Sequence, residues 1–249
     1  MGRVDQKIAI VTGGGNGIGR AIAERLAAEG AIVTVTDQNP AAGKAVADAV
    51  DNIQFLEHDV RIEADWAKVM DNVLQRHGRL DILINNAGIP SSGRAIEMQE
   101  EEWERVIDTN LKGAWLMARE VGSQMIQYNI PGRIINIASV IGVKTSAKRV
   151  LAYSVSKAGL VSLTQSFALE LAEKGICVNA IAPGYIETEL NNEFLQSAAG
   201  QRISTRIPLG RFGETTDLDG VLLMLAGAAA KYITGSIITV DGGLSLSTL

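Results

Sequence analysis

The sequence has little of several residue types on which other protein classes depend. Of its 249 residues, one is cysteine and two are histidine, and 4% are aromatic. The single Cys177 can form neither an internal disulfide nor a zinc cage, and this fits a reducing compartment. We therefore expect a cytoplasmic protein, with Cys177 as a small core residue. His58 and His77 have no partner at ligand spacing, so we expect both in turns and predict no metal site.

An excess of positive charge and a long apolar run are also missing. Lys and Arg total 23 against 28 Asp and Glu, which gives a formal net charge of −5. This balance offers no general attraction to nucleic acid or to anionic lipid. The apolar run near the amino terminus is far shorter than the ~20 residues that span a bilayer. We expect neither a nucleic acid nor a membrane as partner.

Apolar residues make up 47% of the chain and recur in runs of strand length. Most runs are uninterrupted rather than alternating, which is typical of parallel strands covered on both faces. The predicted strands are Lys7–Val11, Ala31–Thr36, Ile53–Glu57, Leu80–Asn85, Arg133–Ala138, Ile176–Ala182 and Ser236–Val240.

Segments with helical spacing lie between these runs. They are Ile18–Ala28, Ala41–Val50, Ala64–Arg76, Glu101–Tyr128, Ala152–Glu173 and Thr216–Ala226. Such alternation predicts an α/β fold of the Rossmann-like, doubly wound kind, with about seven parallel strands and helices on both faces. No linker divides the chain, so we expect one domain over residues 1–249. The stretch Gly184–Gly213 departs from the rhythm and is either a substrate loop or lid or a plain surface segment.

A glycine-rich turn follows the first predicted strand. Gly13, Asn16, Gly17, Ile18 and Gly19 lead into the first predicted helix. Glycines allow the backbone to turn sharply and to approach a pyrophosphate at the positive end of the helix. The spacing differs from the common Gly-x-Gly-x-x-Gly pattern, so this turn alone is weak evidence for a dinucleotide site.

Asp37 at the end of the second predicted strand sharpens the interpretation. A carboxylate there can accept both ribose hydroxyls of an adenosine, which favours NAD. A 2′-phosphate would face that carboxylate, and neither Gln38 nor Asn16 supplies a compensating cation. Arg20 is the one nearby positive charge, and we interpret it as a solvated or phosphate-steering residue.

Tyr153 and Lys157 are four residues apart at the start of a predicted helix, so they project from one face. An adjacent ammonium favours the phenolate, which makes tyrosine a usable base. The pattern alone is common on helix surfaces, but Ser139 ends the preceding strand at the sheet edge where doubly wound folds bind ligands. We expect its hydroxyl to bind the substrate oxygen.

In these residues the chain resembles the short-chain dehydrogenase/reductase family over essentially its whole length. The motifs that carry the resemblance are Thr12-Gly13-x-x-x-Gly17-Ile18-Gly19, Asp59-Val60, Asn85-Asn86-Ala87-Gly88, Asn110, Ser139, Tyr153-x-x-x-Lys157 and Pro183-Gly184. One departure is that 14 positions separate Ser139 from Tyr153 where the family usually has 13. We expect the loop Val140–Leu151 to absorb the extra residue.

The resemblance implies a role for each motif. Tyr153 is the general acid and base, Lys157 lowers its pKa and binds the nicotinamide ribose, Ser139 orients the substrate, and Asn110 holds a water in a proton relay. The implied cofactor contacts are Asp59 and Val60 at the adenine, Asn86, Ala87 and Gly88 at the centre of the cofactor, Thr188 at the carboxamide, and Pro183, Gly184 and Ile186 nearby.

The resemblance further implies a homotetramer with interfaces on Glu101–Tyr128 and Ala152–Glu173. The apolar content of both segments agrees with this, although core packing explains it equally well. Lys144, Lys148 and Arg149 lie near the expected mouth of the site. They either steer an anionic substrate or are solvated loop charges.

We therefore predict an NAD-dependent oxidoreductase that transfers a hydride between nicotinamide and a secondary alcohol or ketone, with a sugar, a polyol or another hydroxy compound among the candidate small-molecule substrates. One alternative is an NADPH-dependent 3-oxoacyl thioester reductase, which would want a basic residue near Asn16 or Gln38. Another is a non-catalytic NAD-sensing regulator, which has no need of an activated phenol. Methyl transfer from a nucleoside cofactor would leave the Tyr153–Lys157 pair idle.

Overall fold

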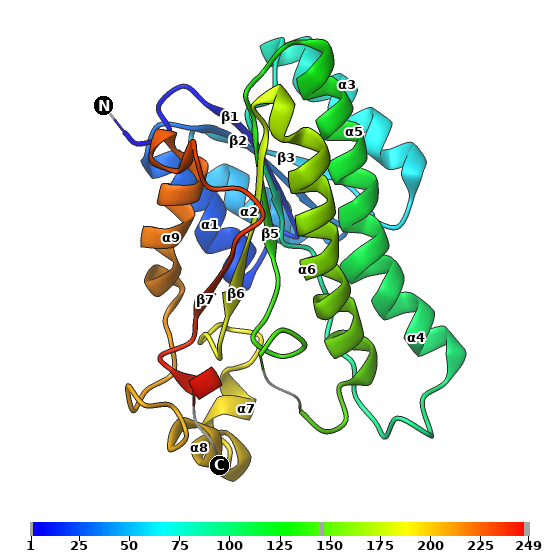
Figure 1. Cartoon of the computed structure of the whole chain (residues 1–249), viewed down its shortest axis with the longest axis vertical. Helices are drawn as coiled ribbons and strands as arrows, with labels where there is room; N and C mark the ends of the chain where they lie inside the picture. Colours follow the sequence, from blue (N-terminus) through cyan, green and yellow to red (C-terminus); the bar gives the residue numbers. More distant parts are fainter. Residues whose placement is uncertain (1, 145–146, 247–249) are drawn as a thin grey trace.

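A seven-stranded sheet forms the centre of the molecule (Figure 1). The computed structural model describes residues 2–144 and 147–246. All strand pairs are parallel, in the order β3-β2-β1-β4-β5-β6-β7. The strands are β1 (Ile8–Thr12), β2 (Ile32–Asp37), β3 (Ile53–Glu57), β4 (Ile82–Asn85), β5 (Arg133–Ile137), β6 (Cys177–Pro183) and β7 (Ile237–Val240). The predicted doubly wound, parallel architecture is confirmed.

Helices cover both faces of the sheet, with α1, α2 and α9 on one face and α3 to α6 on the other (Figure 1). Each helical layer has its own apolar cluster: Ile22 and Leu222 belong to the first, and Trp66 and Met117 to the second. The helices of the described chain are α1 (Gly17–Ala28), α2 (Pro40–Ala49), α3 (Glu63–His77), α4 (Glu100–Ile107), α5 (Gly113–Gln127), α6 (Leu151–Leu171), α7 (Asn192–Gln196), α8 (Ala198–Ser204) and α9 (Asp219–Ala226).

Local chemistry explains several helix ends. The side chain of Asn39 accepts hydrogen bonds from the N–H groups of Ala41 and Ala42, and Pro40 occupies the first turn of α2. At the other end of α3, Gly78 takes a left-handed conformation with φ of 69°, which a glycine adopts without a Cβ penalty.

The predicted single helix over Glu101–Tyr128 is wrong in its middle. A π-helical segment, η1 (Asp108–Lys112), separates α4 from α5. The wider turn places the buried Asn110 amide against the main chain of Ile89, with which it makes two hydrogen bonds of 2.8 and 3.0 Å. Single π turns are frequent at functional sites, and no residue pattern in the sequence announces this one.

The histidines also differ from expectation. His77 is the last residue of α3 rather than part of a turn, and His58 lies buried directly after β3. Two residues of the predicted Val140–Leu151 loop, 145 and 146, lie outside the described residues. None of the described helices is both long and apolar enough to cross a membrane.

The carboxyl ends of the strands all meet at one end of the molecule, where α7 and α8 also lie (Figure 1). The strand order reverses between β1 and β4, so their following loops diverge to opposite faces. Open α/β sheets bind ligands in the crevice at this switch point. The stretch after β6, predicted as a substrate loop or lid, contributes α7 and α8 to the same end.

Candidate active site

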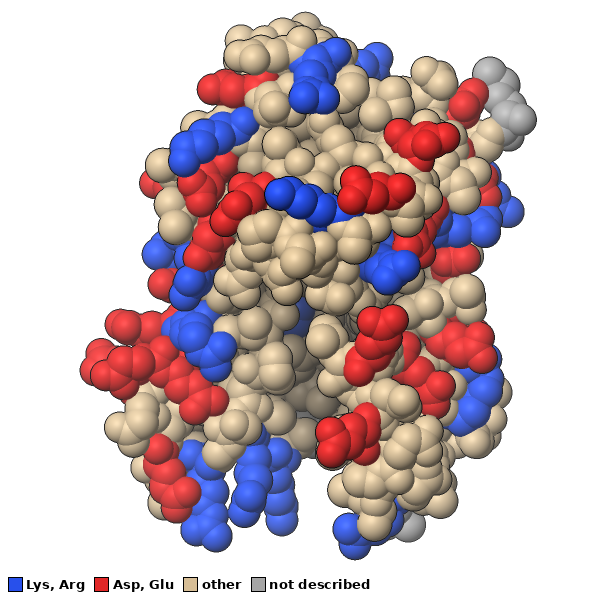
Figure 2. Space-filling view, turned by 180° about the vertical axis from the view of Figure 1, so that it is seen from behind, with Lys and Arg blue, Asp and Glu red and all other residues tan. Residues whose placement is uncertain are grey.

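A cavity of about 720 Å³ opens at this edge of the sheet. Figure 2 shows a hollow in the middle of one face of the molecule. Of the residues predicted for cofactor binding or catalysis, those that line the cavity are Gly13, Asn16, Ile18, Gly19, Asp37, Asp59, Val60, Asn86, Ala87, Gly88, Ser139, Tyr153, Lys157, Pro183, Gly184, Ile186 and Thr188. Gly17 and Asn110 do not line it: Gly17 begins α1, and Asn110 is buried behind the wall.

The glycine turn is held by the loop after β4. The Thr12 hydroxyl accepts hydrogen bonds from the N–H groups of Asn86 and Ala87, both at 3.0 Å. In return, the amide of Asn86 donates to the main-chain oxygens of Thr12 and Gly13. A Cβ on Gly19 would lie 2.2 Å from the Gly13 oxygen and 2.4 Å from the Asn86 amide nitrogen. Only glycine therefore allows this close approach of backbones.

Asp37 ends β2 with its carboxylate turned toward the same turn. One oxygen accepts a hydrogen bond from the Gly15 N–H at 3.0 Å, and the other accepts from the Asn39 N–H at 2.9 Å. Arg20 does not neutralise this carboxylate, because its guanidinium pairs with Glu24 at 2.8 Å. The wall beside Asp37 consists of Gln38 and Asn39, so no cation faces it among the described lining residues.

The end of β3 contributes Asp59 and a buried histidine that the sequence reasoning did not place in the site. The Arg61 side chain, hydrogen-bonded to Asp59, holds the pKa of that carboxyl below its usual range. His58 is 2% exposed, lies 3.1 Å from the Thr36 hydroxyl and packs edge-on against Trp66. Burial lowers the pKa of His58 to about 4, so its ring is neutral at pH 7.

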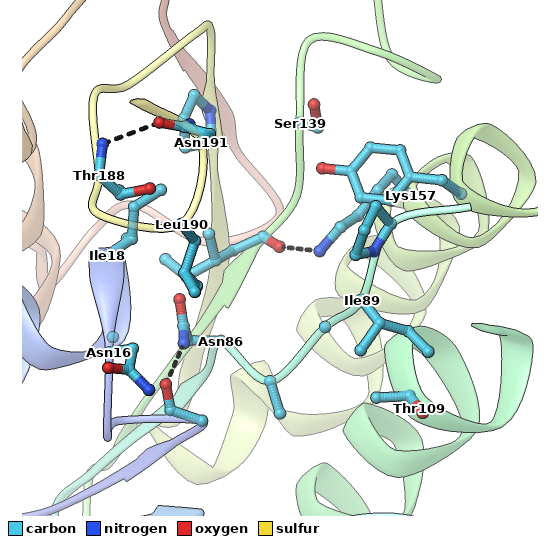
Figure 3. A pocket seen from close by; sticks show the side chains of 18 of the residues that line it. Asn16, Ile18, Asn86, Ile89, Thr109, Ser139, Lys157, Thr188, Leu190 and Asn191 are labelled. Atoms are coloured by element: carbon cyan, nitrogen blue, oxygen red, sulfur yellow. Dashed lines mark hydrogen bonds between the residues drawn. The ribbon is translucent and has the colours of Figure 1, made fainter. Parts of the chain in front are cut away.

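The Tyr153–Lys157 pair and Ser139 meet on the other side of the cavity. The Ser139 hydroxyl lies close enough to the Tyr153 hydroxyl to act on the pKa of that phenol, and the Lys157 Nζ lies 5.6 Å from the centre of the Tyr153 ring. Nζ donates to the main-chain oxygen of Ile137 at 2.7 Å (Figure 3). Thr188 and Asn191 lie across the cavity from Ser139 and Lys157.

Burial dominates the protonation of both groups. It raises the pKa of Tyr153, while the hydrogen bond with Ser139 acts in the opposite direction. It also lowers the pKa of Lys157 to about 8. Because a free phenol titrates near ~10, a raised pKa keeps Tyr153 protonated at neutral pH. That Lys157 lowers the pKa of Tyr153 stays a prediction, because the net shift in this structure is upward.

The main chain of Tyr153 is clamped from both sides. Its N–H donates to the buried Ser91 hydroxyl at 3.1 Å, and its carbonyl accepts from the Ser156 hydroxyl at 2.7 Å. The Asn110 amide donates to Ser156 at 3.1 Å. Val150, at the start of α6, provides no side-chain cap, so Ser91 supplies one from a distant loop. Sequence spacing gives no signal for this contact, because the two residues are 62 positions apart.

Further lining residues were missed, and one group of expected ones lies elsewhere. The missed lining residues include Pro90, Val140, Ile141, Val150, Tyr185 and Phe194. Lys148 and Arg149 line a separate hollow of about 670 Å³ together with Arg94. Lys and Arg side chains gather at this end of the molecule in Figure 2. Lys144 is exposed and lines neither hollow.

Comparisons with known proteins agree with this geometry. Residues 13–245 match a family model described as enoyl-(acyl carrier protein) reductase. Proteins named 3-oxoacyl-[acyl-carrier-protein] reductase FabG are 42% identical in Staphylococcus aureus and 38% identical in Aquifex aeolicus. The alignment with the Staphylococcus aureus protein covers 96% of this chain and 98% of that protein. The alignment with the Aquifex aeolicus protein covers 97% of this chain and 98% of that protein.

Solved structures show the same architecture. A putative gluconate dehydrogenase from Agrobacterium tumefaciens superposes with a TM-score of 0.93 at 34% identity, covering 99% of this chain and 98% of its own. A putative short-chain alcohol dehydrogenase from Sinorhizobium meliloti gives 0.92 at 36% identity, covering 98% of each chain. Together with the ordered motifs around the cavity, these likenesses show that the chain belongs to the short-chain dehydrogenase/reductase family of oxidoreductases.

Proposed function

We propose that this protein is an NAD(H)-dependent oxidoreductase that interconverts a secondary alcohol and its ketone. The observation that carries the proposal is that one cavity is lined by Ser139, Tyr153 and Lys157 at one end and by a glycine turn faced by the Asp37 carboxylate at the other. A phenol that exchanges protons at one end and a dinucleotide cradle at the other are the two parts that hydride transfer between carbon atoms requires.

The residues present fit NAD. The lack of Cβ atoms at Gly13 and Gly19 lets the glycine turn pack directly on the loop after β4. The turn leads into the amino-terminal end of α1, which favours an anion such as a pyrophosphate. Asp37 would accept the adenosine ribose hydroxyls, a role supported by its position in the cavity lining, to which Asp59, Val60 and Thr188 also belong. When bound, the nicotinamide donates or accepts the hydride and, when oxidised, adds a positive charge that favours the Tyr153 phenolate.

The chain's own residues then handle the proton and the substrate oxygen. Ser139 binds that oxygen beside Tyr153, which gives a proton to the ketone in reduction and takes one from the alcohol in oxidation. Lys157 would bind the nicotinamide ribose and bring its charge next to the phenol. Asn110 is proposed to support a proton relay. Its amide is held in position by hydrogen bonds to the Ile89 main-chain oxygen and to the Ser156 hydroxyl.

The test is to follow the reduced nicotinamide by absorbance with a panel of secondary alcohols and ketones. Replacing Tyr153 with Phe should lower kcat by roughly 10³-fold while the Kd for NADH, measured by fluorescence, stays unchanged. Equal turnover in the variant would contradict the proposal. Binding of NADH without turnover of any carbonyl compound would favour the NAD-sensing regulator instead.

A second candidate is an NADPH-dependent reductase of 3-oxoacyl thioesters. It is favoured by relatives at 36% to 42% identity that are named 3-oxoacyl-[acyl-carrier-protein] reductase, including one from Thermotoga maritima. The residues around Asp37 favour NAD instead. The Asp37 carboxylate would repel a 2′-phosphate, and Arg20, which could offset that repulsion, is paired with Glu24.

Cofactor preference separates the two candidates. The wild type should show higher kcat/KM with NADH than with NADPH. The double variant Asp37→Ser, Gln38→Arg should shift that ratio toward NADPH by about 100-fold, equivalent to ~2.7 kcal/mol. An unchanged ratio would overturn the role given to Asp37. A wild type that prefers NADPH and reduces a 3-oxoacyl thioester would establish the second candidate.

We also propose that the α5–α6 face binds further copies of this chain in a homotetramer. A groove there is lined by Leu111, Trp115, Leu163 and Phe167, and the Trp115 side chain is 40% exposed. Apolar surface of this kind on a helical layer is typical of subunit interfaces. The test is light scattering after size-exclusion chromatography.

The variant Ser166→Glu adds a charge within this groove, while Gln165→Glu adds one to an exposed neighbour outside it. Dissociation in the first variant alone would support the interface. A monomeric wild type would contradict it.

A further inference from the structure

The cavity divides into two halves of different chemistry. We define the substrate half as Ser139 and Tyr153 together with six further lining residues, Pro90, Val140, Ile141, Val150, Tyr185 and Phe194. Ile141 and Tyr185 pack against an apolar cluster that contains Val140. The ring centres of Tyr185 and Phe212 lie 6.4 Å apart. This wall is therefore continuous with a local hydrophobic core rather than with solvent-facing loops.

Ionised side chains are confined to the other half or to the floor of the cavity. Among the described lining residues they are Asp37 after β2, Asp59 after β3, and Lys157, whose amine is bonded to Ile137. Arg206 is close enough to oppose the burial-driven rise in the pKa of Tyr185, but it does not line the cavity. No counter-ion for a substrate carboxylate or phosphate therefore lies in the described part of the substrate half.

Hydrogen-bonding capacity is equally limited. Asn191, which also lines the cavity, uses its amide internally: its oxygen accepts from the Thr188 N–H and its nitrogen donates to the Ile186 oxygen (Figure 3). Ser139 and Tyr153 serve the reacting oxygen. Of the other described hydroxyls in the lining, Thr109 donates to the Arg105 oxygen, and Thr188 is proposed for the cofactor carboxamide. Within the substrate half this leaves the Tyr185 hydroxyl for any other polar group of the substrate. A substrate with several hydroxyls would leave most of them unpaired on burial.

We propose that the substrate is a ketone or secondary alcohol whose reacting carbon bears an uncharged hydrocarbon body, and not a polyhydroxylated or carboxylated one. The inference rests on the proposed oxidoreductase function and names the substrate class of the same site. Phe194, 47% exposed at the rim on α7, is the side chain that covers the distal part of this body. Its large exposed apolar surface is the portion of the wall that substrate binding would bury.

A series of straight-chain 2-ketones from butanone to 2-octanone tests the proposal, with the reduced nicotinamide that the wild type prefers. The kcat/KM should rise about fourfold with each added methylene, equivalent to ~0.8 kcal/mol per buried CH₂, until the substrate half is filled. A ketose and a keto acid of matched length should both react far more slowly than the alkanone.

Two variants connect this trend to the wall. Phe194→Asn should lower kcat/KM for 2-octanone by about tenfold and for butanone by less than twofold, because only the longer chain reaches the rim. Tyr232→Asn changes an equally aromatic but fully exposed residue outside the cavity, and should change neither value. NADH affinity in both variants reports that the fold and the cofactor half are intact.

The outcomes separate the two proposals. Faster turnover of the ketose or keto acid, lost in Tyr153→Phe, would overturn the hydrocarbon-body proposal and leave the oxidoreductase function standing. A flat response to chain length would overturn it in the same way. Turnover of none of these carbonyl compounds with either nicotinamide would overturn both proposals.

Discussion

The two halves of the cavity are built by different means. In the cofactor half, main-chain groups of two loops bond to Thr12 and Asn86, and glycines permit the close approach. In the substrate half, apolar side chains from loops and α7 form the wall, and Phe194 is half exposed. A backbone-built site tolerates almost no added atom, whereas a side-chain wall can change by substitution without disturbing the sheet. The first therefore retains a general cofactor, and the second adapts to a particular substrate.

The largest effect is expected from Gly19→Ala, which tests whether the cofactor half depends on close contact between backbones. The added Cβ would meet the Gly13 oxygen at 2.2 Å, so the turn must shift. We expect NAD affinity to fall at least about 100-fold, equivalent to ~2.7 kcal/mol, as measured by calorimetric titration. Gly220→Ala is the control, because a Cβ at Gly220 meets nothing within 4 Å. It should leave affinity unchanged and stabilise α9 by about 0.5–1 kcal/mol. Wild-type affinity in Gly19→Ala would show that the cofactor half is not built on backbone contact.

Lys157 lies where the two halves meet, and its burial should appear in the pH dependence of stability. Its pKa in the folded protein is about 8, whereas a free lysine titrates near ~10.4. Between these values the unfolded chain binds more protons than the folded one, so wild-type stability gains from rising pH. Lys157→Met lacks this gain. The free energy of unfolding of the variant minus that of the wild type should therefore become more negative by roughly 2 kcal/mol between pH 7.5 and pH 10.

Urea unfolding at four pH values measures this difference. The same substitution at the exposed Lys174 controls for the change of side chain. A difference that does not vary with pH would mean that Lys157 is not held in a desolvated position.

The smallest effect is expected from Ser91→Ala, which removes the acceptor of the Tyr153 N–H. The loss of one buried hydrogen bond, ~1 kcal/mol, should lower kcat about fivefold through less exact placement of the phenol. The KM for the nicotinamide should not change, since Ser91 does not line the cavity. Ser92→Ala is the matched control, because Ser92 is the exposed neighbour of Ser91. The substitution keeps the Ser92 N–H, which donates to the Glu102 carboxylate. Equal kcat in both variants would assign Ser91 no positioning role.

The parts of the site that the sequence predicted are those in which local chemistry dictates the residue. Gly13 and Gly19 are needed for backbone approach, Asp37 ends a strand, and Tyr153 and Lys157 share a helix face. The structure brings these residues to one cavity. The missed parts depend on contacts between distant segments. Tyr185 and Phe194 come from the stretch after β6, whose apolar residues carry no periodic pattern, and His58 is drawn inward by packing against Trp66.

The sequence by itself determined the parallel sheet and its sequence of helices, because uninterrupted apolar runs and helical periodicity express burial that every doubly wound fold requires. It also determined the chemical groups available for catalysis. The tertiary structure alone decided the π turn that seats Asn110, the Ser91 bond that caps α6, and the apolar character of the substrate half. The reason is physical: these features arise from contacts between residues far apart in the chain, and no local preference encodes such a contact.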